Sequence, residues 1–235
     1  MNNAQYKSLR TAGILYFLVA ISAPIGILYV PSKLIVKGDA AATADLIRSS
    51  ESLFRLGIAS ELFHQAIAVF LVLALYRLFK PVDENQSKLL VMLGALVSVP
   101  IMFLNVLNEV AVLILLSGAD FLSVFHKDQL VSLAYLFVRL HEQGINIASI
   151  FWGLWLFPFG ILVIKSGFIP RILGYLLYAA GVGYVAAAFA SLILPASAET
   201  VGGIALILEM GELPVMIWLL YRAIRPPQLV GSGKE

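Results

Sequence analysis

Six apolar stretches, each long enough to cross a lipid bilayer, dominate this 235-residue chain. A helix needs about 20 mostly apolar residues to cross the hydrocarbon core. The chain is 60% hydrophobic and only 13% charged, whereas about a quarter of the residues of a soluble domain are charged. With this composition, a soluble fold of the same length would have too few charged residues to cover its surface. The sequence therefore predicts an all-α polytopic membrane protein, with six transmembrane helices in one bundle and a single domain over residues 1–235.

The limits of the spans follow from the segments between them, which carry the charges and the turn-forming residues. Two of these connections, 40–52 and 127–140, also have helical spacing of apolar residues. We expect the first to form a short helix on the membrane surface and the second to run directly into the fourth span. The predicted spans are 11–30, 53–78, 89–116, 144–164, 172–194 and 201–221.

Lysine and arginine residues are distributed unequally between the two sides of the predicted bundle. By the positive-inside rule, the side with ten of them faces the cytoplasm and the side with six faces outward. Both termini are then cytoplasmic, and the first and third loops lie outside. The first apolar run is long enough to span, so we expect an uncleaved helix rather than a signal peptide. The ten are Lys7, Arg10, Arg77, Lys80, Lys88, Lys165, Arg171, Arg222, Arg225 and Lys234; the six are Lys33, Lys37, Arg48, Arg55, Lys127 and Arg139.

Two further properties exclude classes of function. The net charge is only +2, and no basic stripe alternates with aromatic residues, so no nucleic-acid partner is expected. The sequence has no cysteine, which excludes disulfides, thiolate metal sites and cysteine nucleophiles. The partners to expect are membrane lipids and a small-molecule ligand, and the oligomeric state is left open.

Eleven polar or ionisable residues lie inside the apolar spans or at their ends. Burying such groups in hydrocarbon costs several kcal/mol each, so a chain that keeps many of them points them at one another or at a ligand. Counted at about 1.5 Å per residue from the basic residue that closes each span, most lie between mid-membrane and the outer interface. These candidate ligand-binding residues are Glu61, His64, Gln65, Asn105, Asn108, Glu109, His141, Glu142, Asn146, Glu209 and Glu212.

Within each of four helices these residues are three or four positions apart, so they share one face. Four polar faces at similar depth predict a shared polar cavity in the outer half of the bundle. Other interpretations stay open: the amides serve equally well as hydrogen bonds between helices, worth about 0.6 kcal/mol each. His141 and Glu142 fit the wet outer boundary, and a neutral, self-bonded cluster is an alternative to a ligand site.

No cofactor is predicted, and a divalent metal is a weaker alternative. Residues 61–64 read Glu-Leu-Phe-His, a single Glu-x-x-His motif, whereas carboxylate-bridged di-metal bundles use two. The His-Glu-x-x-His zinc motif, a serine nucleophile elbow and Gly-rich phosphate loops are all absent from the sequence. No spacing demands a complete ligand set, so no metal ligands are assigned, and the weak candidates are Glu61, His64, Glu109 and Glu212.

Two features of the later spans concern packing. Pro158 follows a run of aromatic residues in the fourth span and should kink that helix. In the fifth span, Gly183, Ala187 and Ser191 form a small-xxx-small ladder that permits close approach of another helix. We expect this ladder to pack within the monomer rather than between two copies of the chain.

The same region carries a family resemblance. Residues 151–160, Phe-Trp-Gly-Leu-Trp-Leu-Phe-Pro-Phe-Gly, are followed at 166–174 by Ser-Gly-Phe-Ile-Pro-Arg-Ile-Leu-Gly. With Gly211-Glu212 and Trp218-Leu219-Leu220 near the C-terminus, these segments resemble a bacterial membrane family, the domain of unknown function 4386. The resemblance covers almost the whole chain and implies a six-helix protein of the bacterial inner membrane. It transfers no reaction and no catalytic residue, and Arg171 in the short loop fits a contact with lipid headgroups.

The leading hypothesis for function is a binding protein, whose polar cavity in the outer half of the bundle receives a small or amphipathic molecule. His64 is the group in that cavity able to change charge near neutral pH. An alternative is an intramembrane hydrolase acting on lipids, with or without a metal. A transporter is third, because the chain shows no internal repeat. Whether the protein is an enzyme, and which residues would be catalytic, is left open.

Overall fold

The computed structural model describes residues 3–225, and these residues are almost entirely helical with no β-strand among them. Six helical stretches are long and apolar enough to cross a membrane, which confirms the predicted fold class of a multi-pass membrane protein. They cover residues 3–34, 51–79, 84–116, 127–166, 171–193 and 195–224.

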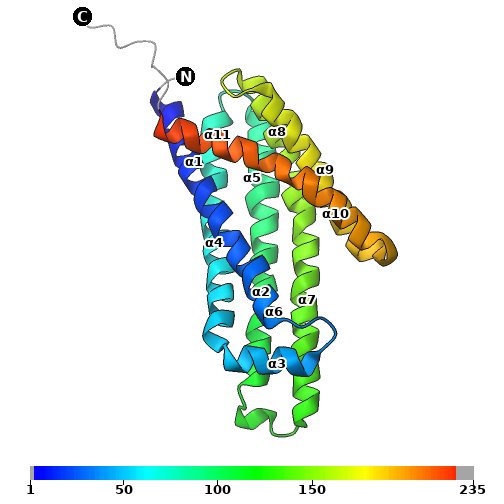
Figure 1. Cartoon of the computed structure of the whole chain (residues 1–235). Helices are drawn as coiled ribbons and strands as arrows, with labels where there is room; N and C mark the ends of the chain where they lie inside the picture. Colours follow the sequence, from blue (N-terminus) through cyan, green and yellow to red (C-terminus); the bar gives the residue numbers. More distant parts are fainter. Residues whose placement is uncertain (1–2, 226–235) are drawn as a thin grey trace, which may run out of the picture. The chain divides into compact units, whose positions relative to one another are not determined.

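Several of the six stretches consist of more than one helix (Figure 1). The α-helices are α1 (Asn3–Pro24), α2 (Val30–Leu34), α3 (Ala40–Ser49), α4 (Glu51–Phe79), α5 (Glu84–Val91), α6 (Ser98–Leu116), α7 (Lys127–Leu154), α8 (Leu156–Ser166), α9 (Arg171–Ile193), α10 (Ala198–Glu209) and α11 (Leu213–Ile224). Two π-helical segments, η1 (Ile25–Tyr29) and η2 (Met92–Val97), join consecutive α-helices, and 3₁₀ segments occur at η3 (Asp120–Leu122), η4 (Pro195–Ser197) and η5 (Met210–Glu212).

Both connections that were predicted to be helical are helices. The first loop contains α3, and the predicted helix from Lys127 runs without interruption into the fourth span as α7. The third span begins earlier than residue 89, because Asp83 caps α5 by accepting a hydrogen bond from the Gln86 backbone amide at 3.1 Å. The turn-forming segment between the second and third spans is therefore shorter than the sequence pattern indicates.

The predicted kink in the fourth span takes the form of a break between α7 and α8 at Trp155. Proline has no backbone N–H, and its ring collides with the carbonyl of the residue four positions earlier. For Pro158 that residue is Leu154, the last residue of α7. The break therefore lies where the chemistry of Pro158 requires it.

The described residues divide into two compact units. Unit 1 holds residues 3–19, 67–99 and 146–225, and unit 2 holds residues 20–66 and 100–145. Helices α1, α4, α6 and α7 each contribute residues to both units. The single-domain organisation of the chain stays a prediction.

The core of unit 1 is built from segments of several spans. On α4, Leu71, Leu75 and Leu78 are spaced i, i+4, i+7 and are at most 2% exposed, so they form one apolar stripe. Phe79 at the end of this stripe lies edge-on to Phe159 of α8, with 5.8 Å between the ring centroids. These contacts join α4 to the aromatic segment of the fourth span.

Glycine residues let the helices of unit 1 approach closely. A Cβ atom on Gly181 of α9 would lie 2.9 Å from the carbonyl oxygen of Gly153 on α7, and one on Gly153 would lie 2.7 Å from the carbonyl oxygen of Gly181. Gly183 faces α10 instead, where a Cβ atom would lie 2.9 Å from the Ala205 carbonyl oxygen. The glycine of the predicted small-residue ladder is thus used within the monomer.

One ion pair of unit 1 links the connection between α4 and α5 to the end of α8. Lys165 Nζ donates a hydrogen bond to Asp83 Oδ2 at 2.8 Å, and this contact holds the pKa of Asp83 below its usual value. A lowered carboxyl pKa means that the contact stabilises the fold at neutral pH and is lost as the pH falls through that pKa.

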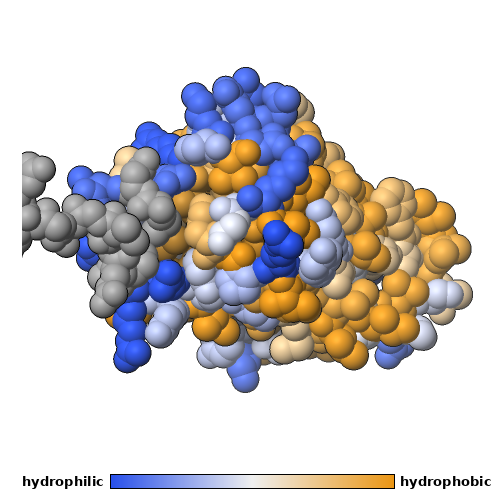
Figure 2. All heavy atoms as spheres, turned by 90° about the horizontal axis from the view of Figure 1, so that it is seen from above, coloured by the Kyte–Doolittle hydropathy of each residue, from blue (hydrophilic) through white to orange (hydrophobic). Residues whose placement is uncertain are grey.

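Viewed from the end that carries the N-terminus, hydrophilic atoms gather over part of the surface, with hydrophobic atoms beside them (Figure 2).

Unit 2 contains the end of the first span, α3, and the adjoining segments of α4, α6 and α7. Its core is apolar: Val30 and Leu34 from α2 pack with Phe54 of α4 and Val138 of α7, all at most 6% exposed. Ile47 of the short helix α3 belongs to the same cluster, which fixes α3 across the ends of the neighbouring helices (Figure 1).

The glycine contact between α7 and α9 generates a first prediction. A leucine at Gly181 would collide with the α7 backbone, so Gly181→Leu should destabilise the protein by about 1–3 kcal/mol, seen as a lower melting temperature in detergent. Gly202→Leu is the matched control, because a Cβ atom there meets nothing within 4 Å. Equal melting temperatures for the two variants would contradict the close packing.

Candidate metal centre

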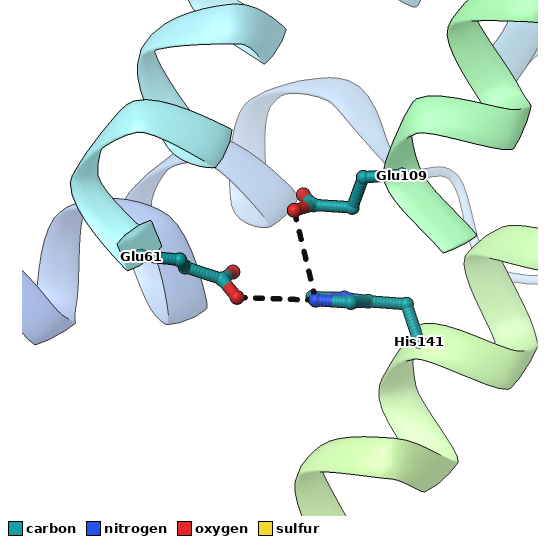
Figure 3. A group of neighbouring side chains, drawn as sticks. All are labelled: Glu61, Glu109 and His141. Atoms are coloured by element: carbon teal, nitrogen blue, oxygen red, sulfur yellow. Dashed lines mark hydrogen bonds and ion pairs between the residues drawn. The ribbon is translucent and has the colours of Figure 1, made fainter. Parts of the chain in front are cut away.

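Three of the predicted polar residues converge in unit 2: Glu61 from α4, Glu109 from α6 and His141 from α7 (Figure 3). Each lies on a regular stretch of α-helix next to an exposed apolar residue (Leu62, Val110 and Leu140), whereas its own side chain is buried. Their exposed fractions are 2%, 7% and 8%. Two carboxyl groups and an imidazole are therefore removed from solvent together.

The geometry centres on one nitrogen of the imidazole. His141 Nε2 lies 3.1 Å from Glu61 Oε2 and 3.7 Å from Glu109 Oε2. One donor atom from each of the three residues lies within 4.8 Å of the others. Both carboxylates thus approach the same ring atom from different helices, as Figure 3 shows.

Several buried polar atoms in and beside this cluster have no hydrogen-bond partner. Among the described residues, Glu61 Oε1 and Glu109 Oε2 are buried and make no hydrogen bond. The buried amide nitrogen Nε2 of Gln65, one helical turn after Glu61, also makes none. A buried polar atom without a partner costs about 1–3 kcal/mol, and a charged one costs more. A further group bound here would give these oxygens a partner.

The separations fit a metal ion. Around a tetrahedral ion with bonds of about 2.1 Å, neighbouring donor atoms lie about 3.4 Å apart, and around an octahedral ion about 3.0 Å. The first distance, 3.1 Å, is close to the octahedral value, and the second, 3.7 Å, is slightly longer than the tetrahedral one. The donor set, two carboxylate oxygens and one imidazole nitrogen, is one that first-row divalent ions accept. A bound ion would also give a ligand role to Glu109 Oε2, which makes no hydrogen bond within the described residues.

The residues around the centre hold these three side chains in place. Asn105 donates a hydrogen bond from Nδ2 to the His141 carbonyl oxygen at 2.9 Å, which ties α6 to α7 at the level of the site. Asn108 in turn donates to Asn105 Oδ1 at 3.0 Å. Gly144 leaves room for this arrangement, because a Cβ atom there would overlap the Asn105 amide. The two asparagines therefore position the imidazole and its helix.

Gly26 makes room for Glu61. It lies in the π-helical segment η1, a kind of distortion frequently found at functional sites. A Cβ atom on Gly26 would lie 2.6 Å from Glu61 Cγ and 3.0 Å from the Gly57 carbonyl oxygen. Nothing in the sequence pattern pointed to this glycine, because its role depends on a contact between the first two spans.

Two other predicted residues of unit 2, His64 and Glu142, have partners outside the cluster. His64 Nδ1 is 3.3 Å from the Ser22 hydroxyl, so this imidazole faces the first span. Glu142 is exposed and pairs with Arg139 on its own helix, whereas His141 is buried. The position of these two residues at the outer boundary stays a prediction. Of the weak metal candidates, Glu61 and Glu109 belong to the cluster, and the imidazole beside them is that of His141.

The polar residues of unit 1 have partners of another kind. Tyr16 donates a hydrogen bond to one oxygen of Glu212, and the Tyr184 hydroxyl lies 3.4 Å from the other oxygen. Asn146 Nδ2 donates to Ser191 Oγ at 2.9 Å, as expected for a hydrogen bond between helices. Glu209 is half-buried one turn before Glu212. The sequence missed both tyrosines, since tyrosine is common in apolar spans.

The comparisons with known proteins agree with the resemblance seen in the sequence. The family model described as domain of unknown function (DUF4386) matches residues 11–223, nearly the whole chain. The chain belongs to this family. No curated protein and no solved structure matches. Membership confirms the resemblance, and it leaves the role of the buried cluster to be argued from geometry.

The contact between Gly26 and Glu61 generates a second prediction. Gly26→Ala should cost about 1–3 kcal/mol of stability, because its methyl group displaces the Glu61 side chain. In a Glu61→Ala background the same change should cost less, since the obstructed atoms are gone. Melting temperatures of the four proteins in a double-mutant cycle, measured with a chelator present, give the coupling. Additive effects would show that the glycine does not serve Glu61.

Proposed function

We propose that this protein is a divalent-metal-binding protein of the bacterial inner membrane, with both termini in the cytoplasm and the ion held by Glu61, Glu109 and His141. The observation that carries the proposal is the convergence of three buried donor atoms, two of them carboxylate oxygens, on one point. With this orientation the metal centre lies in the outer half of the membrane.

Charge balance supports an ion. Two carboxylates beside a neutral imidazole carry a charge of −2, and leaving that charge uncompensated among apolar side chains costs several kcal/mol or more. The basic partner that both carboxylates share is His141. A protonated imidazole offsets one of the two charges, whereas a divalent cation offsets both. A site with such an ion is electrically neutral, which suits its burial.

Size favours an ion over a larger ligand. The pocket beside Glu109 and His141 has a volume of about 20 Å³. A single water molecule requires a cavity of about 10–15 Å³, so the pocket holds roughly one water molecule. A small or amphipathic molecule, the leading expectation from sequence, needs several hundred Å³. The cluster with its pocket therefore suits an ion and one water.

The donor types narrow the choice of metal. Carboxylate and imidazole ligands without thiolate suit zinc, manganese and iron, and calcium prefers six or more oxygen ligands. Three protein ligands with a remaining position for water is the pattern of catalytic zinc sites. Zinc is therefore the reference ion for the experiments that follow.

The proposal predicts one equivalent of zinc per chain. Purified protein, stripped with a chelator and then titrated with Zn²⁺, should bind one ion by calorimetry and retain it through gel filtration by elemental analysis. At free zinc 100 times the dissociation constant, binding should stabilise the fold by about 2.7 kcal/mol and raise the melting temperature. Glu61→Gln, Glu109→Gln and His141→Ala should each abolish stoichiometric binding.

Matched variants separate this site from the other polar residues. His64→Ala changes the histidine three residues after Glu61 on α4, and Glu209→Gln changes a carboxylate of unit 1. Both variants should bind zinc like the wild type. If wild-type protein takes up no stoichiometric zinc, manganese or iron, the cluster is a self-bonded group of protonated side chains and the proposal fails. Equal loss of metal in the control variants would contradict the assignment of ligands.

Binding should also depend on pH. Metal ligands must lose their protons before they coordinate, so zinc and protons compete for the same three side chains. The apparent affinity for zinc should therefore fall as the pH is lowered, and the stabilisation by zinc should shrink with it. Calorimetric titrations between pH 5.5 and 8 measure this competition. An affinity independent of pH over that range would mean that these residues are not the ligands.

A further inference from the structure

A carboxylate that holds a metal ion through one oxygen still has a second oxygen without a role. In the proposed centre Glu61 approaches His141 with Oε2, so Oε2 is the oxygen that would hold the ion. The other oxygen, Oε1, is buried and makes no hydrogen bond within the described residues. Carboxylates that ligate a metal are themselves hydrogen-bonded as a rule, because a bond to the free oxygen fixes the ligand. When the ion is bound, Glu61 Oε1 therefore requires a donor of its own.

The polar side chains closest to Glu61 in the chain are engaged with the first span. The Ser60 hydroxyl donates a hydrogen bond to the Ser22 carbonyl oxygen at 2.8 Å, and His64 Nδ1 lies 3.3 Å from the Ser22 hydroxyl. On the side of the first span, Gly26 lies against Oε1 and has no side chain to offer. These residues therefore leave Oε1 without a side-chain donor.

Gln65 carries the complementary atom. It follows Glu61 by four residues on α4, is 1% exposed, and has a buried Nε2 without a hydrogen bond in the described part of the chain. Side chains four residues apart lie on the same face of a helix, with about 5–6 Å between their Cβ atoms, and a glutamine at this spacing can bond to an acidic side chain. One unused donor and one unused acceptor thus lie inside the protein on one face of α4.

We infer that Gln65 is a positioning residue of the proposed metal centre, an inference that rests on the proposed function. When Glu61 holds the ion through Oε2, Gln65 Nε2 donates a hydrogen bond to Glu61 Oε1. The two atoms do not bond to each other in this structure, and the rotatable bonds of the glutamine side chain allow its amide to turn toward the carboxylate. Coordination requires an ionised Glu61, and a hydrogen bond to an ionised oxygen is about twice as strong as one between neutral groups. The bond therefore belongs chiefly to the metal-loaded protein.

Such a hydrogen bond acts on the affinity for the ion. It fixes the plane of the Glu61 carboxylate, so that Oε2 stays directed at the point that it shares with His141 Nε2. It also gives the buried Oε1 a partner at the moment when the carboxylate must be charged. Both effects stabilise the loaded form more than the zinc-free form. Gln65 thus strengthens binding without touching the ion.

The test compares the full-length wild type with Gln65→Met in detergent, with Zn²⁺ as the probe. Methionine is unbranched and flexible like glutamine but has no amide. Zinc affinity, measured by competition with a chelating dye, should fall about 10- to 100-fold, while saturating zinc still gives one equivalent per chain. The zinc-stripped variant should melt at the wild-type temperature or above, because it loses a buried nitrogen that has no partner.

Two results of this comparison would overturn the inference. One is an unchanged zinc affinity in Gln65→Met, with or without a change in melting temperature, because Gln65 would then have at most a structural role. The other comes from the matched control Ser60→Ala, which removes a buried polar group of α4 that bonds to the first span. This control should keep the zinc affinity of the wild type. An equal loss of affinity in both variants would mean that any disturbance of α4 weakens the site.

Infrared spectroscopy reads the hydrogen bond itself. A carboxylate whose free oxygen loses a donor absorbs at higher frequency in its antisymmetric stretch. Of the two carboxylate bands that zinc produces in the wild type, one should move to higher frequency in Gln65→Met and the other should stay. Gln65→Leu, which also removes the amide, should give the same shift. Two unchanged bands in the zinc-loaded variants would contradict a bond between Gln65 and Glu61.

The outcomes for the metal and for Gln65 are distinguishable. Wild-type protein that binds no stoichiometric metal removes the proposed function, and the role of Gln65 with it. Wild-type protein that binds zinc with the same affinity as Gln65→Met leaves the metal centre intact and removes only the role of Gln65.

Discussion

The arrangement of unit 2 depends on the confinement of two carboxyl groups and one imidazole inside apolar surroundings. An ionised carboxylate is costly there without a partner, and a positive charge shared by the two carboxylates offsets that cost. The local structure serves this meeting: Gly26 leaves space for the Glu61 side chain, and Asn105 ties the helix of His141 to that of Glu109. These contacts come at some cost in helical regularity, since η1 interrupts the first span.

Unit 1 contains a carboxyl group whose hydrogen bonds come entirely from other side chains of the protein. Each oxygen of Glu212 lies next to a tyrosine hydroxyl, one from Tyr16 and one from Tyr184. A carboxyl group with both oxygens satisfied needs no ligand, and here it joins α1 and α9 to the last span. Glu61 and Glu109 differ in that each retains an oxygen without a hydrogen bond within the described residues. That difference in hydrogen bonding, rather than burial alone, is the reason for proposing a site in unit 2.

The sequence predicted the fold well because length and polarity decide it. Apolar runs between charged loops located all six spans, and the helical spacing after Lys127 located the helix that leads into the fourth. For the site, the spacing of the polar residues predicted which of them share a helix face, but not which residues of other helices they contact. Glu61 and His64 are three residues apart, which separates their directions by about 60° around the helix axis. The structure sends His64 toward Ser22 and brings His141 to Glu61, and such pairing between helices leaves no trace in one sequence.

The proposed ligands and another part of the pocket wall come from different kinds of backbone, one regular and one irregular. The three proposed ligands come from uninterrupted stretches of α4, α6 and α7, which hold donor atoms more accurately than loops do. The opposite wall comes from the end of the first span, where η1 and Pro31 interrupt the α-helical hydrogen bonding. Irregular backbone shifts more readily than a continuous helix, because fewer of its hydrogen bonds have to be broken together. The side of the pocket formed by the proposed ligands is therefore the more rigid one, and the α2 side is the more deformable one.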